Sequence, residues 1–163
     1  MEILTIGHPL LSQKMKPVTD YGTALEKIAH DMMETMVFYE GIGLAANQVG
    51  YDQQILVIHE KLISEDKNFL VITNPVVELR EGSLRREEGC LSVPGIYAEV
   101  TRPAQIQIRY QDISGKEQIL EAESLLARVI LHENDHLNGV LFVERLPKIK
   151  QKLLQPRLKK LSR

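Results

Sequence analysis

The segment His132-Glu133-Asn134-Asp135-His136 constrains this chain more than any other part of its sequence. Residues four apart lie on the same face of a helix, so both imidazoles can reach a single metal ion. Leu125 and Val129 continue this face, which indicates that the two rings point into the core. Two buried histidines without an ion would leave several ring nitrogens to satisfy. The pattern predicts a metal-binding helix over residues 124–138, capped by Gly139.

A catalytic metal site needs a third protein ligand and an open position for water. Phe142 stands where one class of metallopeptidase has a third histidine, and no acid follows Glu144 to serve as in another class. The upstream choices are a carboxylate, His8, His30, His59 or Cys90. Cys90 is favoured, because a thiolate binds dications strongly and the neighbouring glycines and Pro94 suit a fixed, irregular backbone. The alternative is that Cys90 is an ordinary core residue.

Hydrophobic spacing predicts further helices at both ends of the chain. The first covers residues 24–38, with Thr23 and Glu26 as a capping box at its start. Its apolar stripe consists of Leu25, Ile28, Ala29, Met32, Met33, Met36 and Val37. The last covers residues 148–161, where Pro156 is expected to kink or interrupt the helix.

The middle of the chain is rich in β-type residues separated by turn signals. Strands are predicted at 54–58, 70–73, 76–80, around Val100, and at 106–110, 118–122 and 140–143. No repeat or linker divides the 163 residues, and 44% apolar with 26% charged residues is ordinary for a globular domain. The sequence predicts a single α+β domain, with mainly antiparallel strands around a central metal-binding helix, an N-terminal helix and a C-terminal helix.

The net charge of -2 conceals a basic C-terminal end. Residues 145–163 contain eight Lys or Arg residues and no acid. This basic tail, about residues 147–163, indicates either a contact with an anionic partner or a solvated helix face. Because the chain starts without the basic and apolar regions of a signal peptide and has no run of ~20 apolar residues, we expect a cytoplasmic protein without membrane contact.

Three segments, in this order and spacing, together resemble the peptide deformylases. They are Gly41-Ile42-Gly43-Leu44-Ala45-Ala46-Asn47-Gln48, Glu88-Gly89-Cys90-Leu91-Ser92 and His132-Glu133-Asn134-Asp135-His136. The likeness extends from about Gly7 to Leu146, and the chain resembles the compact bacterial form with a helical C-terminus. The family removes the formyl group from the N-terminal formylmethionine of newly made proteins. The resemblance implies a hydrolase acting on N-formylmethionyl nascent peptides.

The resemblance also implies roles for individual residues. The implied ligands of one divalent ion are Cys90, His132 and His136. Glu133 is the acid–base group, and Gln48 and the backbone amide of Leu91 are the oxyanion donors. The usual ion of the family is Fe2+, and Zn2+, Ni2+ or Co2+ can occupy the site. A ribosome contact through the basic tail is expected, and no specific contact with DNA.

The expected substrate-binding residues are Ile42, Gly43, Gly89, Leu125 and Val129. Gly43 and Gly89 carry no Cβ, so a substrate backbone can approach them and pair as an added strand. Leu125 and Val129 are expected to line an apolar pocket for the methionine side chain, the alternative being plain core. Asp135 faces away from the ion on helical geometry and is predicted to pair with Arg102.

Two other functions stay open on the residues alone. A general zinc peptidase is the first, and the missing third ligand of the known peptidase patterns disfavours it. A binding module with a structural ion, docking on RNA or the ribosome through the basic tail, is the second. On this second hypothesis, Glu133 would lie beside an open coordination position and would have no role.

Overall fold

The computed structural model describes residues 1–62 and 69–162. Its α-helices are α1 (Thr23–Phe38), α2 (Ser124–Leu137) and α3 (Lys148–Leu161). Its strands are β1 (Gly43–Ala45), β2 (Ile55–His59), β3 (Phe69–Glu81), β4 (Leu84–Cys90), β5 (Val93–Arg102), β6 (Gln105–Gln111) and β7 (Glu117–Glu123). Short 3-10 helices are η1 (Pro9–Ser12), η2 (Ala46–Val49), η3 (Glu60–Leu62) and η4 (Phe142–Arg145). Among the described residues, none of the helices combines the length and apolar character that crossing a membrane requires.

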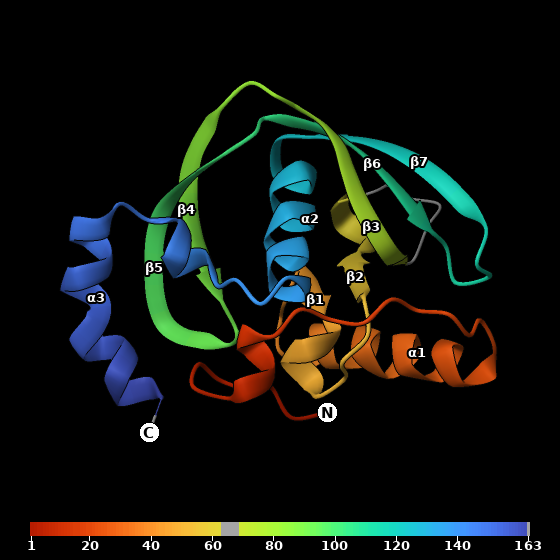
Figure 1. Cartoon of the computed structure of the whole chain (residues 1–163), viewed down its shortest axis with the longest axis horizontal. Helices are drawn as coiled ribbons and strands as arrows, with labels where there is room; N and C mark the ends of the chain where they lie inside the picture. The colour runs from red at the N-terminus through yellow and green to blue at the C-terminus, as the bar shows by residue number, and fades with distance from the viewer. Residues whose placement is uncertain (63–68, 163) are drawn as a thin grey trace.

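The strands form two antiparallel sheets with α2 between them (Figure 1). One sheet has the order β1-β2-β3-β6-β7, and the other is the β4–β5 hairpin. All of the neighbouring strands in both sheets run antiparallel. This arrangement confirms the predicted α+β fold and its central helix. It also brings the end of β4 close to α2, although the two are far apart in the sequence.

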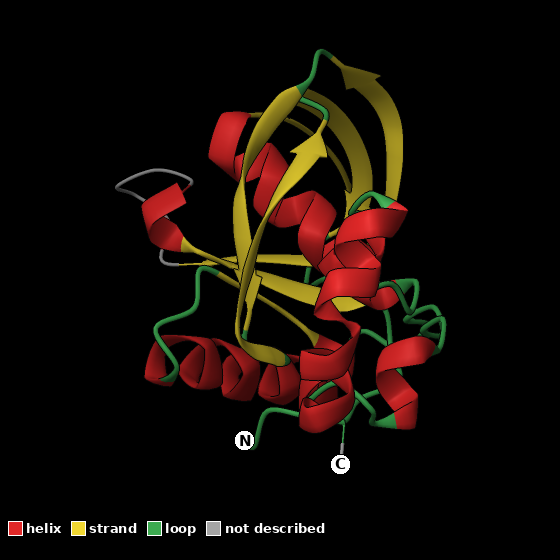
Figure 2. Ribbon diagram, turned by 90° about the vertical axis from the view of Figure 1, so that its left-hand side faces the viewer, coloured by secondary structure: helices red, strands yellow, loops and turns green. Residues whose placement is uncertain are grey.

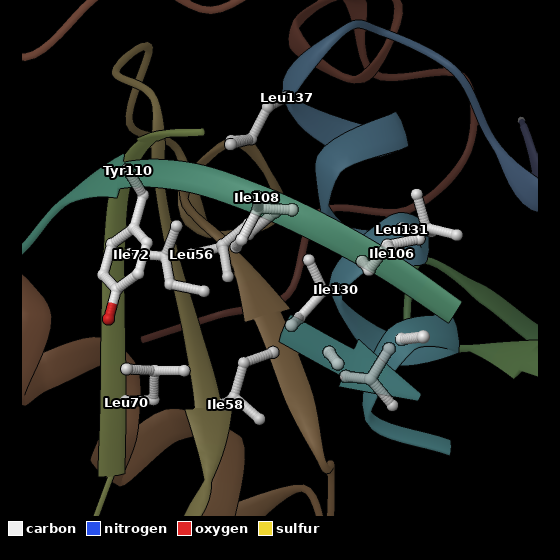
Figure 3. Close-up of a cluster of buried hydrophobic side chains, with 14 of the residues drawn as sticks. Leu56, Ile58, Leu70, Ile72, Ile106, Ile108, Tyr110, Ile130, Leu131 and Leu137 are labelled. Carbon is white, nitrogen blue, oxygen red and sulfur yellow. The ribbon is translucent and has the colours of Figure 1, made fainter. Parts of the chain in front are cut away.

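Helix α2 is almost entirely buried because apolar residues surround it on several sides. One side, including Ile130 and Leu131, packs against the inward side chains of β2, β3 and β6, as Figure 3 shows. Helix α1 packs on the opposite face of β2, which explains why nearly every residue of β2 is buried instead of alternate ones. The two helices therefore hold the larger sheet from both faces.

The C-terminal end of α2 packs tightly on the N-terminal segment. Gly139 follows the helix with a φ of +72°, as a C-terminal glycine cap does, so the predicted cap is confirmed. A Cβ at Gly139 would lie 2.7 Å from the carbonyl carbon of Ser12 and 2.8 Å from the amide nitrogen of Gln13. Because Met15 also donates its amide to the Leu137 carbonyl, the end of the helix has a fixed position.

Four local predictions are wrong. The strands predicted separately at 70–73 and 76–80 form the single strand β3, because its pairing with β6 continues past Asn74 and Pro75 with a shift in register. Helix α1 has Gly22 as its N-cap and no side-chain capping bond, so Thr23 and Glu26 form no capping box; the Glu26 amide donates instead to the Gly22 carbonyl. The segment 140–143 is not a strand, because its buried apolar residues enter the 3-10 helix η4 and pack on β5. Val37, expected on the buried stripe of α1, is 47% exposed.

Helix α3 covers residues 148–161 as predicted, and Pro156 does not interrupt it. The carbonyl that loses its partner to the proline lies on an outer helix, where water can satisfy it. Leu154, Leu158 and Leu161 pack against the cluster formed by β5 and η4, whereas Ile149 and Leu153 are 76% and 73% exposed. The helix is thus attached along one face, and both chain ends lie at the same end of the molecule (Figure 2).

Candidate metal centre

Cys90, His132 and His136 come together where the end of β4 meets α2. One potential ligand atom from each lies within 4.8 Å of the other two. The Cys90 Sγ is 3.1 Å from His136 Nε2, and the centroids of the two imidazole rings are 5.1 Å apart. One sulfur and two ring nitrogens converging from separate elements form a donor set suited to a transition-metal ion.

The orientation of the His132 ring is set by Glu88, which precedes Cys90 by two residues on the same face of β4. Glu88 Oε2 accepts a hydrogen bond from His132 Nδ1 at 3.0 Å. With Nδ1 occupied, Nε2 is left to face a metal ion, which is the usual arrangement of a metal-binding histidine. The carbonyl of His136 in turn accepts a bond of 2.6 Å from the Asn47 side chain.

A chain of ion pairs, buried except at Arg145, extends from Glu88 along α2. Arg102 donates to both Glu88 oxygens, at 2.6 and 2.9 Å, and to Asp135 at 2.8 Å. Arg145 completes the chain by donating from Nε to Asp135 at 3.0 Å. The predicted pair between Asp135 and Arg102 is therefore confirmed, and it joins β5 to the helix that carries both histidines.

The ionisation of these groups favours a positive charge at the centre. Burial opposes ionisation of Glu88, but its bonds to His132 and Arg102 outweigh burial and lower its pKa to about 2. Burial likewise opposes protonation of His132, yet the hydrogen bonds to Cys90 and Glu88 raise its pKa to about 10. Burial keeps the pKa of His136 well below its ordinary value, so this ring is neutral and able to donate a lone pair. A cation suits such surroundings.

Glu133 is buried beside these residues and has an unpartnered oxygen. Burial raises its pKa to about 7, and Oε2 makes no hydrogen bond within the described chain. Its neighbour Gly43 leaves the room it needs, since a Cβ there would lie 2.7 Å from Glu133 Oε1 and 2.6 Å from Val129 Cγ1. A buried, unpaired acceptor at this point fits a site that receives a metal ion and a polar substrate.

Gln48 lies beside Cys90 in space, and Leu91 follows Cys90 in the chain. Gln48 accepts from the Ala45 amide through Oε1 at 2.8 Å, which fixes its orientation. Its Nε2 then faces Ser92 Oγ at 3.2 Å and Cys90 Sγ at 3.6 Å. Leu91 is in the two-residue loop between β4 and β5, outside the strand ladder. The Gln48 amide group and the residue that follows Cys90 are thus close to the sulfur.

A cavity of about 840 Å³ opens onto this centre. Its lining includes each of the residues expected to bind substrate, namely Ile42, Gly43, Gly89, Leu125 and Val129. The structure gives Gly89 a further role, because a Cβ there would lie only 2.5 Å from the ring of Tyr97, its partner on β5. The space that a side chain at Gly89 would need is therefore occupied by the Tyr97 ring, which also lines the cavity.

The sequence reasoning missed Glu88, Arg128 and Asn47, which support the centre from behind. Glu88 could have been found from its position two residues before Cys90, since alternate residues of a strand share a face. Arg128 could have been found from its position four residues before His132. The other upstream histidines are elsewhere: His8 caps η1, His59 ends β2, and His30 is exposed on α1.

A thiol and two imidazoles around a potential ion, beside an open cavity and a buried carboxylate with one unpartnered oxygen in the described residues, define the class of metal-dependent hydrolases. Comparison with known proteins narrows this class. The family model described as polypeptide deformylase matches residues 1–152. The chain belongs to this family.

Individual relatives match this chain over nearly its full length. A peptide deformylase of Rhizobium meliloti is 44% identical over 162 residues, covering 99% of this chain and 93% of the relative. The crystal structure of peptide deformylase from Thermus thermophilus matches with a TM-score of 0.88 and 41% identity, covering 99% and 98% of the two chains. An Arabidopsis thaliana peptide deformylase in complex with an inhibitor matches with a TM-score of 0.93 and 34% identity, covering 99% and 90%.

Replacing Asp135 by asparagine should weaken the fold, because the substitution removes the charge that two arginines share. We expect Asp135→Asn to lower the free energy of unfolding by about 3 kcal/mol, measured by urea denaturation. Asp52→Asn is the matched control, since Asp52 pairs with Lys16 on the exposed surface, where an ion pair contributes less than about 1 kcal/mol. Equal effects of the two substitutions would contradict a stabilising role for the buried chain of ion pairs.

Proposed function

We propose that this chain carries out the reaction of its family, hydrolysis of the N-formyl group from the N-terminal formylmethionine of newly synthesised proteins, with release of formate. One observation carries the proposal, namely that Cys90, His132 and His136 converge beside the buried carboxylate of Glu133, one oxygen of which has no partner among the described residues. Since the substrate is a chain emerging from the ribosome, the enzyme acts in the cytoplasm.

Cys90, His132 and His136 would hold one divalent ion. Thiolate and imidazole ligands accept Fe2+, Zn2+, Ni2+ and Co2+, and Fe2+ is our proposal for the ion in the cell. When bound, such an ion would polarise the formyl carbonyl and lower the pKa of a water molecule. The protein contributes a fixed ring at His132, a neutral ring at His136, and the sulfur of Cys90 at the end of a strand.

Glu133 moves the proton. As water attacks the formyl carbon, the carboxylate accepts the proton that the water loses. It then returns this proton to the nitrogen that leaves when the C–N bond breaks. A pKa raised by burial to about 7 suits both transfers, because neither the charged nor the neutral form is strongly favoured at neutral pH.

Gln48 and Leu91 stabilise the negative charge that develops on the formyl oxygen. The Gln48 side chain cannot turn freely, because its Oε1 is held by the Ala45 amide, so its NH2 group stays directed toward Cys90 and Ser92. The Leu91 amide, in the loop that follows Cys90, is the second donor. A fixed donor of this kind typically contributes ~10²–10³ to the rate.

The cavity receives the methionine. Leu125 and Ile42 line it and are 43% and 42% exposed, so a bound side chain can cover them. Covering these side chains and Val129 with the methionine side chain removes apolar surface from water and so favours binding. The peptide backbone runs past Gly43 and Gly89 as an added strand.

Exchange of Glu133 for glutamine tests the reaction, because glutamine keeps the shape of the side chain but cannot carry the proton. Glu133→Gln should retain metal and lower formate release from formyl-Met-Ala-Ser by ~10²–10⁴. Glu121→Gln, on the exposed face of β7, is the control. Wild-type turnover in the Glu133→Gln enzyme would rule out this role. Hydrolysis of unformylated Met-Ala-Ser, with none of the formylated peptide, would favour a peptidase instead.

We also propose that the basic tail, residues 147–163, contacts the ribosome. Deleting the tail is a poor test, since Leu154, Leu158 and Leu161 pack on the core and their loss would expose it. Changing the exposed Lys152, Lys159 and Lys160 to glutamine keeps the packing. We expect this triple variant to lose a salt-sensitive cosedimentation with ribosomes, since each phosphate contact adds to the salt dependence.

The control for this experiment changes three exposed lysines elsewhere to glutamine, namely Lys14, Lys27 and Lys116. The control alters net charge equally and should leave cosedimentation nearly unchanged. Equal binding by the two triple variants would show that the tail has no specific part in the contact.

A further inference from the structure

Arg128 is a buried arginine in the wall of the cavity. It lies one helical turn before His132 and is only 4% exposed. Its Nη1 donates to Glu88 Oε1 at 2.5 Å and to the Val100 carbonyl at 3.0 Å, and its Nη2 donates to the Leu84 carbonyl. One side chain of α2 is thus bonded to both β4 and β5, the strands of the hairpin in which β4 ends at Cys90.

Glu88 does not need Arg128 for charge neutralisation. Arg102 already donates to both oxygens of Glu88 and also pairs with Asp135. Burying a second arginine is costly, and the Nε of Arg128 has no partner in the described chain. What Arg128 adds is the pair of bonds to the Val100 and Leu84 carbonyls, which tie the helix to the backbones of β5 and β4.

We propose that Arg128 is a positioning residue for the metal centre: its guanidinium holds α2 at a fixed distance from the β4–β5 hairpin and so sets the Cys90 sulfur against the two imidazoles. This role rests on the proposed function, since it concerns the same centre. Cys90 is joined to β4, whereas His132 and His136 are on α2, and these elements belong to separate layers. Arg128 crosses this boundary from the helix by bonding to Glu88, whereas Arg102 crosses it from the hairpin by bonding to Asp135.

The fork of the guanidinium is essential to this role. It presents several N–H groups in one plane and so reaches Glu88 and two carbonyls at once, which a lysine ammonium on a flexible stem cannot do with the same geometry. Supporting residues of this kind typically change metal affinity by ~10–100-fold when they are lost. The effect is expected on metal binding itself, independently of catalysis.

The test compares zinc binding in variants of the full chain. Metal-depleted protein is titrated with zinc in competition with a chromophoric chelator, and Arg128→Leu should raise the dissociation constant ~10-fold. Arg128→Lys should fall between the wild type and the leucine variant. In the zinc-loaded protein, the NMR signal of the proton between His132 Nδ1 and Glu88 should move upfield in Arg128→Leu, because that hydrogen bond lengthens.

Arg86→Leu is the matched control, since Arg86 is an exposed arginine on β4 that makes no ion pair among the described residues. It should leave both measurements at their wild-type values. A wild-type dissociation constant and an unmoved signal in Arg128→Leu would overturn the proposal. If the leucine variant fails to fold, the same two readouts in Arg128→Lys decide. Neither readout uses a formylated substrate, so failure of this proposal is distinguishable from failure of the proposed reaction.

Discussion

The metal centre depends on the interactions of one buried group, the carboxylate of Glu88. It accepts from Arg102 and Arg128 and from His132 Nδ1, so it connects the hairpin to α2. A buried charge without these partners would be strongly unfavourable, and the partners would be equally unfavourable without it. The helix and the hairpin are therefore stable in one relative position, and Cys90, two residues after Glu88, is brought to the histidines.

The same packing separates the supporting and reacting sides of α2. On one side, Asp135 joins Arg102 and Arg145 in ion pairs that hold the helix. On the other side, Glu133 has an oxygen without a partner and a pKa raised to about 7 by burial. Adjacent helix positions differ in direction by about 100°. One short segment can thus contain two ligands, a proton carrier and a structural anion.

The parts of the structure that could be predicted from sequence are those that depend on local spacing. The helix with His132 and His136 follows from their separation, and the cap at Gly139 from the glycine at its end. The exclusion of other third ligands pointed to Cys90, and helical geometry indicated that Asp135 faces away from the ion, although it did not by itself select Arg102 as the partner. Contacts between segments that are distant in the sequence were harder to predict. Nothing local indicates that Tyr97 covers Gly89, that the apolar run at 140–143 forms a 3-10 helix, or that Arg128 bonds to two strands. These features arise only when the layers meet.

X-ray absorption spectroscopy of the zinc-loaded protein tests the central claim most directly, because it reports the atoms around the ion. The arrangement of Cys90, His132 and His136 predicts one sulfur neighbour at about 2.3 Å and two imidazole nitrogens at about 2.0–2.1 Å, with one further light atom in the open position. A spectrum without a sulfur neighbour, at full zinc occupancy, would contradict the claim that the hairpin and the helix share one metal centre.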